Sequence, residues 1–209
     1  MKQITKNSIN GLPAQFILSI KPKEYLVQGP SHCGAYSVKG ILSAYGLDIK
    51  AHPKEYHPHI FGRLTGFTFG KNYLPTILKR NGISAERKSA DKLSPPLRID
   101  LLKSQLSKDK PVMIRIGNGY ISDTYNSLVG KLMSHWITLW GYDDNRRLFF
   151  IYDSGLPQKY WGITLPIGNT TRTYKEIIRD WNMGRWQFWY WPFFGSRNTQ
   201  TYIEIYGRN

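Results

Sequence analysis

The sequence predicts an α+β fold, with helices mainly in the first half of the chain and antiparallel strands in the second. Apolar residues recur at helical spacing over residues 33–45 and again over residues 97–108, which indicates two amphipathic helices. The later apolar runs are short and rich in β-branched and aromatic residues, as strands are: PVMIRI at 111–116, HWITLWGY at 135–142 and LFFIY at 148–152.

The last two of these runs are predicted to pair as a β-hairpin, because the residues DDNRR join them and Asp and Asn favour tight turns. The other expected elements are a strand around residues 16–20, a loop at 51–70, a helix at about 72–80, a helix within TRTYKEIIRDW and a final strand at 201–206. The aromatic segment at 186–194 is expected to pack in the core or along a cleft rather than to stack on nucleic-acid bases.

Length and composition are those of a globular domain, since 41% of the 209 residues are hydrophobic. No apolar run approaches the roughly 18 residues of a membrane-spanning helix. The N-terminal patch FILSI is too short for a secretory signal. A cytoplasmic protein is therefore expected, with export by an unconventional route as the alternative.

The formal net charge of +15 favours acidic partners, such as nucleic acid, an anionic cell-wall polymer or an acidic protein. The positive residues are spread along the chain, and no nucleic-acid-binding motif is present. Nucleic-acid binding is therefore not expected, and the charge by itself identifies no partner.

The single cysteine, Cys33, lies where a loop gives way to the first helix, in the stretch GPSHCGAYSVKG. It is either a reactive thiol or an inert buried residue. A position in the first helical turn, after Ser31 as the N-cap, would lower the pKa of the thiol, because the helix dipole and the unpaired N–H groups stabilise a thiolate. Gln28 is close enough in sequence to direct its side-chain amide at an oxyanion, together with the N–H of Cys33.

His135 begins one predicted strand of the hairpin and Asp153 follows the other. The start of one strand and the end of its antiparallel partner lie side by side, so the carboxylate is expected to hold the imidazole. The residues Asp143 and Asp144 fall in the turn at the far end of the hairpin and are expected to be structural.

These segments together resemble the C39-like branch of the papain-like cysteine peptidases, over about residues 25–206. The resemblance rests on QGPSHCGAYSVKGILSAYG, KPVMIRI, SHWITLWGYDDNRRLFFIYDSG and YKEIIRDW, in this order. It implies a papain-like fold and the roles of oxyanion donor for Gln28, nucleophile for Cys33, base for His135 and orienting carboxylate for Asp153. In this chain Asp-Ser-Gly replaces the usual Asp-Pro of the family. The chain is expected to form a single domain at 1–209, with insertions near 117–134 and 154–172 relative to a minimal domain of the family.

The predicted function is hydrolysis of peptide bonds through a thioester acyl-enzyme, without a cofactor and with a protein or peptide as substrate. The alternatives are another thiol acyl-transfer enzyme of the same fold (a cell-wall amidase, a deamidase or a transglutaminase-like effector) and a non-catalytic binding module. No metal site is expected, because the spacing of His52, His57 and His59 matches no zinc pattern. The three histidines fall in the Pro-rich segment 51–70, which is expected to be a surface loop.

Overall fold

The computed structural model describes residues 11–68, 70, 72–121, 124–183 and 200–209, so the aromatic segment at 186–194 lies outside the described residues. The main strands are β1 (Gln15–Ile17), β2 (Ile83–Ser89), β3 (Val112–Gly117), β6 (Ser134–Asp143), β7 (Leu148–Tyr152), β8 (Thr170–Thr173) and β9 (Thr201–Arg208). The α-helices are α1 (Cys33–Ala44), α2 (Ile60–Thr65), α3 (Tyr73–Arg80), α4 (Pro95–Leu106), α5 (Ser127–Leu132) and α6 (Tyr174–Met183).

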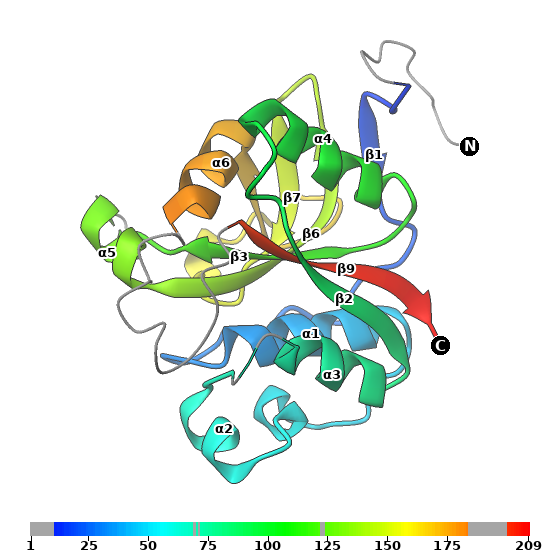
Figure 1. Cartoon of the computed structure of the whole chain (residues 1–209), viewed down its shortest axis with the longest axis vertical. Helices are drawn as coiled ribbons and strands as arrows, with labels where there is room; N and C mark the ends of the chain where they lie inside the picture. Colours follow the sequence, from blue (N-terminus) through cyan, green and yellow to red (C-terminus); the bar gives the residue numbers. More distant parts are fainter. Residues whose placement is uncertain (1–10, 69, 71, 122–123, 184–199) are drawn as a thin grey trace.

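Within the described residues, the seven main strands form one twisted sheet in the order β2-β9-β3-β6-β7-β8, with β1 paired to β6. The strand pairs are antiparallel. The helices α1 and α3 cover one face of the sheet, and α4 and α6 cover the other (Figure 1). This arrangement confirms the predicted α+β fold, and it adds a second helical layer behind the sheet.

Helix α1 forms where the apolar spacing predicts it, and it packs against β6. Its inward side chains, Ala35, Val38, Ile41 and Leu42, are fully buried. The helix ends in a Schellman motif, with the N–H of Leu47 donating to the carbonyl of Leu42. Gly46 adopts φ 68° in this motif, a left-handed conformation that glycine enters without a steric penalty. The nucleophile candidate therefore lies at the start of a helix anchored along its length.

The hairpin of β6 and β7 is also present as predicted. Thr138 pairs with Tyr152 and Asp143 with Leu148, so the start of β6 lies beside the chain that leaves β7. The other edge of β6 pairs with β3, where Ile116 faces His135. Strand β3 on one edge and the chain that leaves β7 on the other therefore fix the beginning of β6. The large side chains in and around this hairpin are fully buried: Tyr142, Phe149, Phe150 and Trp140.

Several local predictions are incomplete or wrong. Strands β2 and β8 were not predicted from the sequence. Residues 51–70 are not a plain loop, since they contain the 3-10 helix η1 (Pro53–Tyr56) and α2. His57, which was expected on the surface of this segment, is fully buried. The segment 117–134 contains the strand pair β4 (Tyr120–Ile121) and β5 (Thr124–Tyr125) as well as α5, and 154–172 contains the 3-10 helix η2 (Gln158–Tyr160). No helix in the described part is long and apolar enough to cross a membrane.

Candidate active site

Cys33 is the first residue of α1 and is half-buried. The prediction of Ser31 as the N-cap is wrong: His32 occupies the N-cap position, in a left-handed conformation at φ 77°, and its side chain makes no capping hydrogen bond. The His32 ring instead links the loop before Cys33 to α2. Its Nδ1 lies 2.7 Å from the Ser31 hydroxyl, and its Nε2 lies 2.9 Å from the Arg63 carbonyl oxygen. Because that carbonyl can only accept, Nε2 of His32 carries a proton. The loop before Cys33 is thereby held in place from the side of α2.

The structure brings His135 and Asp153 together. Nε2 of His135 lies 2.7 Å from Oδ1 of Asp153, and the two side chains are each only 4% exposed. Gly155 packs against the imidazole, since a Cβ added at this position would lie 3.1 Å from Cε1 of His135. The ring is thus confined by the close approach of Gly155 and held at one nitrogen by Asp153.

Three further groups fix Asp153. Its second carboxylate oxygen accepts from Nη2 of Arg172 at 2.9 Å, and Oδ1 also accepts from the Gly155 N–H at 2.9 Å. The side-chain amide of Asn169 pairs with both backbone polar groups of Asp153, at 2.8 Å in each case. Arg172 also bonds the fully buried Asp180 at 2.6 Å. The carboxylate is therefore held rigidly and in its charged form.

The electrostatics favour an ion pair between Cys33 and His135. Burial alone would lower the pKa of His135, but the charge and hydrogen bond of Asp153 and the neighbouring Cys33 thiol raise it to about 10. Burial alone would raise the pKa of Cys33, but the hydrogen bond and charge of His135 and the backbone groups of Trp136 and Gly34 hold it below the usual value. Burial likewise opposes the charge of Asp153, and the cations of His135 and Arg172 outweigh it and lower the pKa of that carboxyl.

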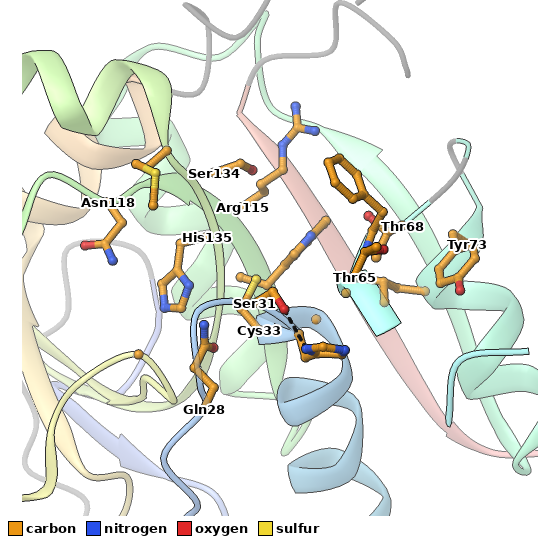
Figure 2. A pocket seen from close by; sticks show the side chains of 18 of the residues that line it. Gln28, Ser31, Cys33, Thr65, Thr68, Tyr73, Arg115, Asn118, Ser134 and His135 are labelled. Carbon is orange, nitrogen blue, oxygen red and sulfur yellow. Dashed lines mark hydrogen bonds between the residues drawn. The ribbon is translucent and has the colours of Figure 1, made fainter. Parts of the chain in front are cut away.

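Gln28 faces the same site from the segment that precedes α1. Its backbone N–H donates to the Ser154 carbonyl oxygen at 2.8 Å, and its side-chain Oε1 accepts from the Ser154 hydroxyl at 2.6 Å. Figure 2 shows its side chain extending toward Cys33 and His135.

Gln28, Cys33 and His135 line a cavity of about 430 Å³. Thr65, Thr68 and Tyr73 come from the helical side, and Asn118, Ser134 and His135 from the opposite side (Figure 2). Arg87 and Arg115 also line the cavity, and burial together with the charge of Arg115 lowers the pKa of Arg87 to about 10. An open cavity with a thiol, an imidazole and a primary amide along one wall is suited to acyl transfer.

A sequence model of the Peptidase_C39 like family matches residues 17–182, which is most of the chain. The chain belongs to this family. No curated protein shows a significant match. Among solved structures, the crystal structure of a double glycine motif protease from an AMS/PCAT transporter, in complex with the leader peptide, aligns with a TM-score of 0.49 at 12% identity, over 93% of this chain and 99% of that chain.

Membership in the C39-like family confirms the resemblance stated from the sequence motifs, and with it the papain-like α+β fold. The family supports a cysteine peptidase as the class of protein. Of the predicted site residues, Gln28, Cys33 and His135 line one cavity, and Asp153 lies behind His135. Asp143 and Asp144 lie at the far end of the hairpin, where Asp144 pairs with Lys103.

Four supporting residues of this C39-like chain were missed by sequence reasoning. Ser154 and Gly155 carry a signal, since they follow Asp153 directly in the motif DSG. Asn169 and Arg172 carry none, because only the folded sheet brings β8 to Asp153. Among the described residues, no group of three or more His, Cys, Asp or Glu side chains could hold a metal ion. His57 instead bonds the Tyr73 hydroxyl through Nδ1 at 2.9 Å.

Proposed function

We propose that this chain hydrolyses peptide bonds, with Cys33 as nucleophile, His135 as general base and acid, Asp153 as the orienting carboxylate and Gln28 as an oxyanion donor. The observation that carries the proposal is the restrained imidazole, whose Nε2 lies 2.7 Å from Oδ1 of Asp153. Since Nε2 is occupied by this contact, Nδ1 is the nitrogen available to the Cys33 thiol in the same cavity.

The reaction follows from these positions. The thiolate of Cys33 attacks the amide carbonyl carbon, and the carbonyl electron pair moves to oxygen, where the Gln28 amide and the Cys33 N–H stabilise it. The imidazolium of His135 then donates its proton to the departing amine, which leaves a thioester on Cys33. Neutral His135 next takes a proton from water, whose oxygen attacks the thioester carbonyl. The tetrahedral intermediate collapses, the C–S bond breaks, and the carboxylic acid leaves with the Cys33 thiolate and the His135 imidazolium restored.

The substrate class proposed is a peptide, bound in an extended form across the cavity. The walls of the cavity offer both apolar and polar contacts to such a peptide, and Thr68 and Arg115 are among the residues that line it (Figure 2). The amine and acyl parts of a peptide would then lie on either side of Cys33, within reach of His135 and Gln28 respectively.

A direct test is to incubate the chain with a mixture of unstructured peptides and to identify new termini by mass spectrometry. We expect peptide cleavage by the wild type, and a loss of at least about a thousandfold in Cys33→Ala and in His135→Ala. His59→Ala is the matched control, because His59 is an exposed histidine that caps α2 without a side-chain bond.

The products separate this proposal from its alternatives. Ammonia released from glutamine side chains would indicate a deamidase, and amines joined to glutamine would indicate a transglutaminase. Either result without new peptide termini would contradict the proposed peptidase activity. Cleavage that persists in Cys33→Ala would contradict the assignment of the nucleophile.

A further inference from the structure

Gln28 and Ser154 are joined by two hydrogen bonds, although they are far apart in the sequence. The Gln28 N–H donates to the Ser154 carbonyl oxygen at 2.8 Å, and the Ser154 hydroxyl donates to Oε1 of Gln28 at 2.6 Å. Ser154 is 2% exposed, so the hydroxyl is shielded from competing water. The two bonds restrain both the backbone and the side chain of Gln28.

The second bond decides what the Gln28 side chain offers to the cavity. A primary amide has one accepting oxygen and one donating nitrogen, on opposite sides of the carbonyl carbon. With Oε1 engaged by the Ser154 hydroxyl, the donating Nε2 is directed to the other side. In Figure 2 the amide nitrogen of Gln28 lies at the end of the side chain nearest His135 and Cys33. A donor at this position can stabilise an oxyanion, whereas an amide oxygen would repel it.

We propose that Ser154 is a positioning residue, which orients the Gln28 amide so that Nε2 faces the developing oxyanion; this inference rests on the proposed function. Ser154 directly follows Asp153, so the tripeptide Asp153-Ser154-Gly155 supports both halves of the site. Asp153 and Gly155 hold the imidazole of His135, and Ser154 holds the oxyanion donor. A proline at position 154 would have no hydroxyl to donate to Oε1 of Gln28.

Two probes of Cys33 separate this role from a general structural one. 2,2′-Dithiodipyridine contains no carbonyl group: the Cys33 thiolate attacks one sulfur and releases pyridine-2-thione, without an oxyanion. p-Nitrophenyl acetate acylates Cys33 through a tetrahedral oxyanion and releases p-nitrophenolate. The first probe therefore reports the thiolate and His135 alone, and the second also reports the oxyanion donors.

Removal of the donor itself in Gln28→Ala is expected to slow acylation by p-nitrophenyl acetate about a hundredfold. Ser154→Ala is expected to slow it about tenfold, because the amide remains but is no longer oriented. The rate of Ser154→Ala with 2,2′-dithiodipyridine, and the pH profile of that rate, should equal those of the wild type. Ser154→Thr retains the hydroxyl and should restore acylation. Ser104→Ala, which removes a hydroxyl that donates to the Leu101 carbonyl of its own helix α4, is the matched control.

The double variant Gln28→Ala/Ser154→Ala should acylate at the rate of Gln28→Ala alone, because Ser154 acts through Gln28. Additive losses would overturn the inference. So would wild-type acylation in Ser154→Ala, or an equal loss with both probes. If the wild type itself is acylated no faster than Cys33→Ala, the proposed function fails and this inference fails with it. If the wild type is acylated and only the Ser154 results disagree, the proposed function stands without this inference.

Discussion

Nε2 of His135 lies 2.7 Å from Oδ1 of Asp153, and both side chains are almost completely buried. In this surrounding an imidazolium and a carboxylate stabilise each other, and the imidazolium in turn stabilises a thiolate on Cys33. The pKa of His135 is raised to about 10 and that of Cys33 is lowered. We therefore expect the thiolate–imidazolium ion pair at pH values between the lowered pKa of the thiol and the raised pKa of the imidazole.

The first prediction concerns the reactivity of this ion pair at low pH. We expect Cys33 to react with iodoacetamide at about pH 6 faster than a free cysteine, whose thiolate is scarce there. Asp153→Asn removes the charge that supports the imidazolium, so the pKa of His135 falls, that of Cys33 rises, and the reaction at this pH slows by about tenfold or more. The second-order rate constant, measured as a function of pH, tests this.

Asp91→Asn is the control for this measurement, because Asp91 is an exposed carboxylate. Its rate profile should match the wild type. A wild-type Cys33 that reacts no faster than a free thiol would contradict the ion pair and would favour a binding module without catalysis.

The second prediction concerns stability at high pH. The folded-state pKa of His135, about 10, lies above the value of roughly 6.5 in an unfolded chain, so its protonation favours the folded state. This contribution is fully present below about pH 6.5 and is lost as the pH rises through about 10. We expect the difference in Tm between the wild type and His135→Gln to shrink over that range. Thermal unfolding at a series of pH values measures it, and a constant difference would contradict the raised pKa.

The third prediction concerns Arg172, whose guanidinium bridges Asp153 and Asp180 with Nη–Oδ2 distances of 2.9 and 2.6 Å. Arg172→Leu leaves two buried carboxylates without this cation, and we expect it to lower the free energy of unfolding by about 3 to 5 kcal/mol. Arg172→Lys keeps the charge but not the planar fork, and should lose less. Urea unfolding measures both.

Arg146→Leu is the matched control, since Arg146 is exposed in the turn between β6 and β7. A change within about 0.5 kcal/mol is expected there. If Arg172→Leu unfolds at the same urea concentration as this control, the bridge does not stabilise the fold.

The elements with a strong local pattern could be predicted from the sequence. The hairpin of β6 and β7 has two apolar runs joined by good turn residues. Because the two strands are antiparallel, His135 at the start of β6 and Asp153 just after β7 come to lie side by side. The C-terminal end of α1 carries its signal in Gly46, which adopts the left-handed conformation that ends the helix.

The elements that depend on distant partners could not be predicted. Strand β2, with the sequence ISAERKS, lacks an apolar run, and it is stabilised by pairing with β9, including the contact of Lys88 Nζ with Glu204 Oε2 at 2.6 Å. The bond from Ser154 to Gln28 and that from Arg172 to Asp153 likewise exist only after the sheet has formed. The candidate nucleophile, base and orienting carboxylate could thus be named from the sequence, but the hydrogen bonds that Ser154 and Arg172 contribute to the site could not.

The fourth prediction concerns His32, the left-handed residue that precedes Cys33, with φ 77° and ψ 12°. Both His32→Gly and His32→Ala lose the ring bonds to Ser31 and Arg63. Only alanine keeps the steric cost of a Cβ in this conformation, so His32→Gly should be the more stable of the two by up to about 1 kcal/mol in urea unfolding. The order is expected to reverse at Thr76, an exposed position within α3, where alanine is favoured over glycine by about 1 kcal/mol. The same order at both positions would show that the backbone at His32 is not strained, and that the ring bonds alone hold the loop before Cys33.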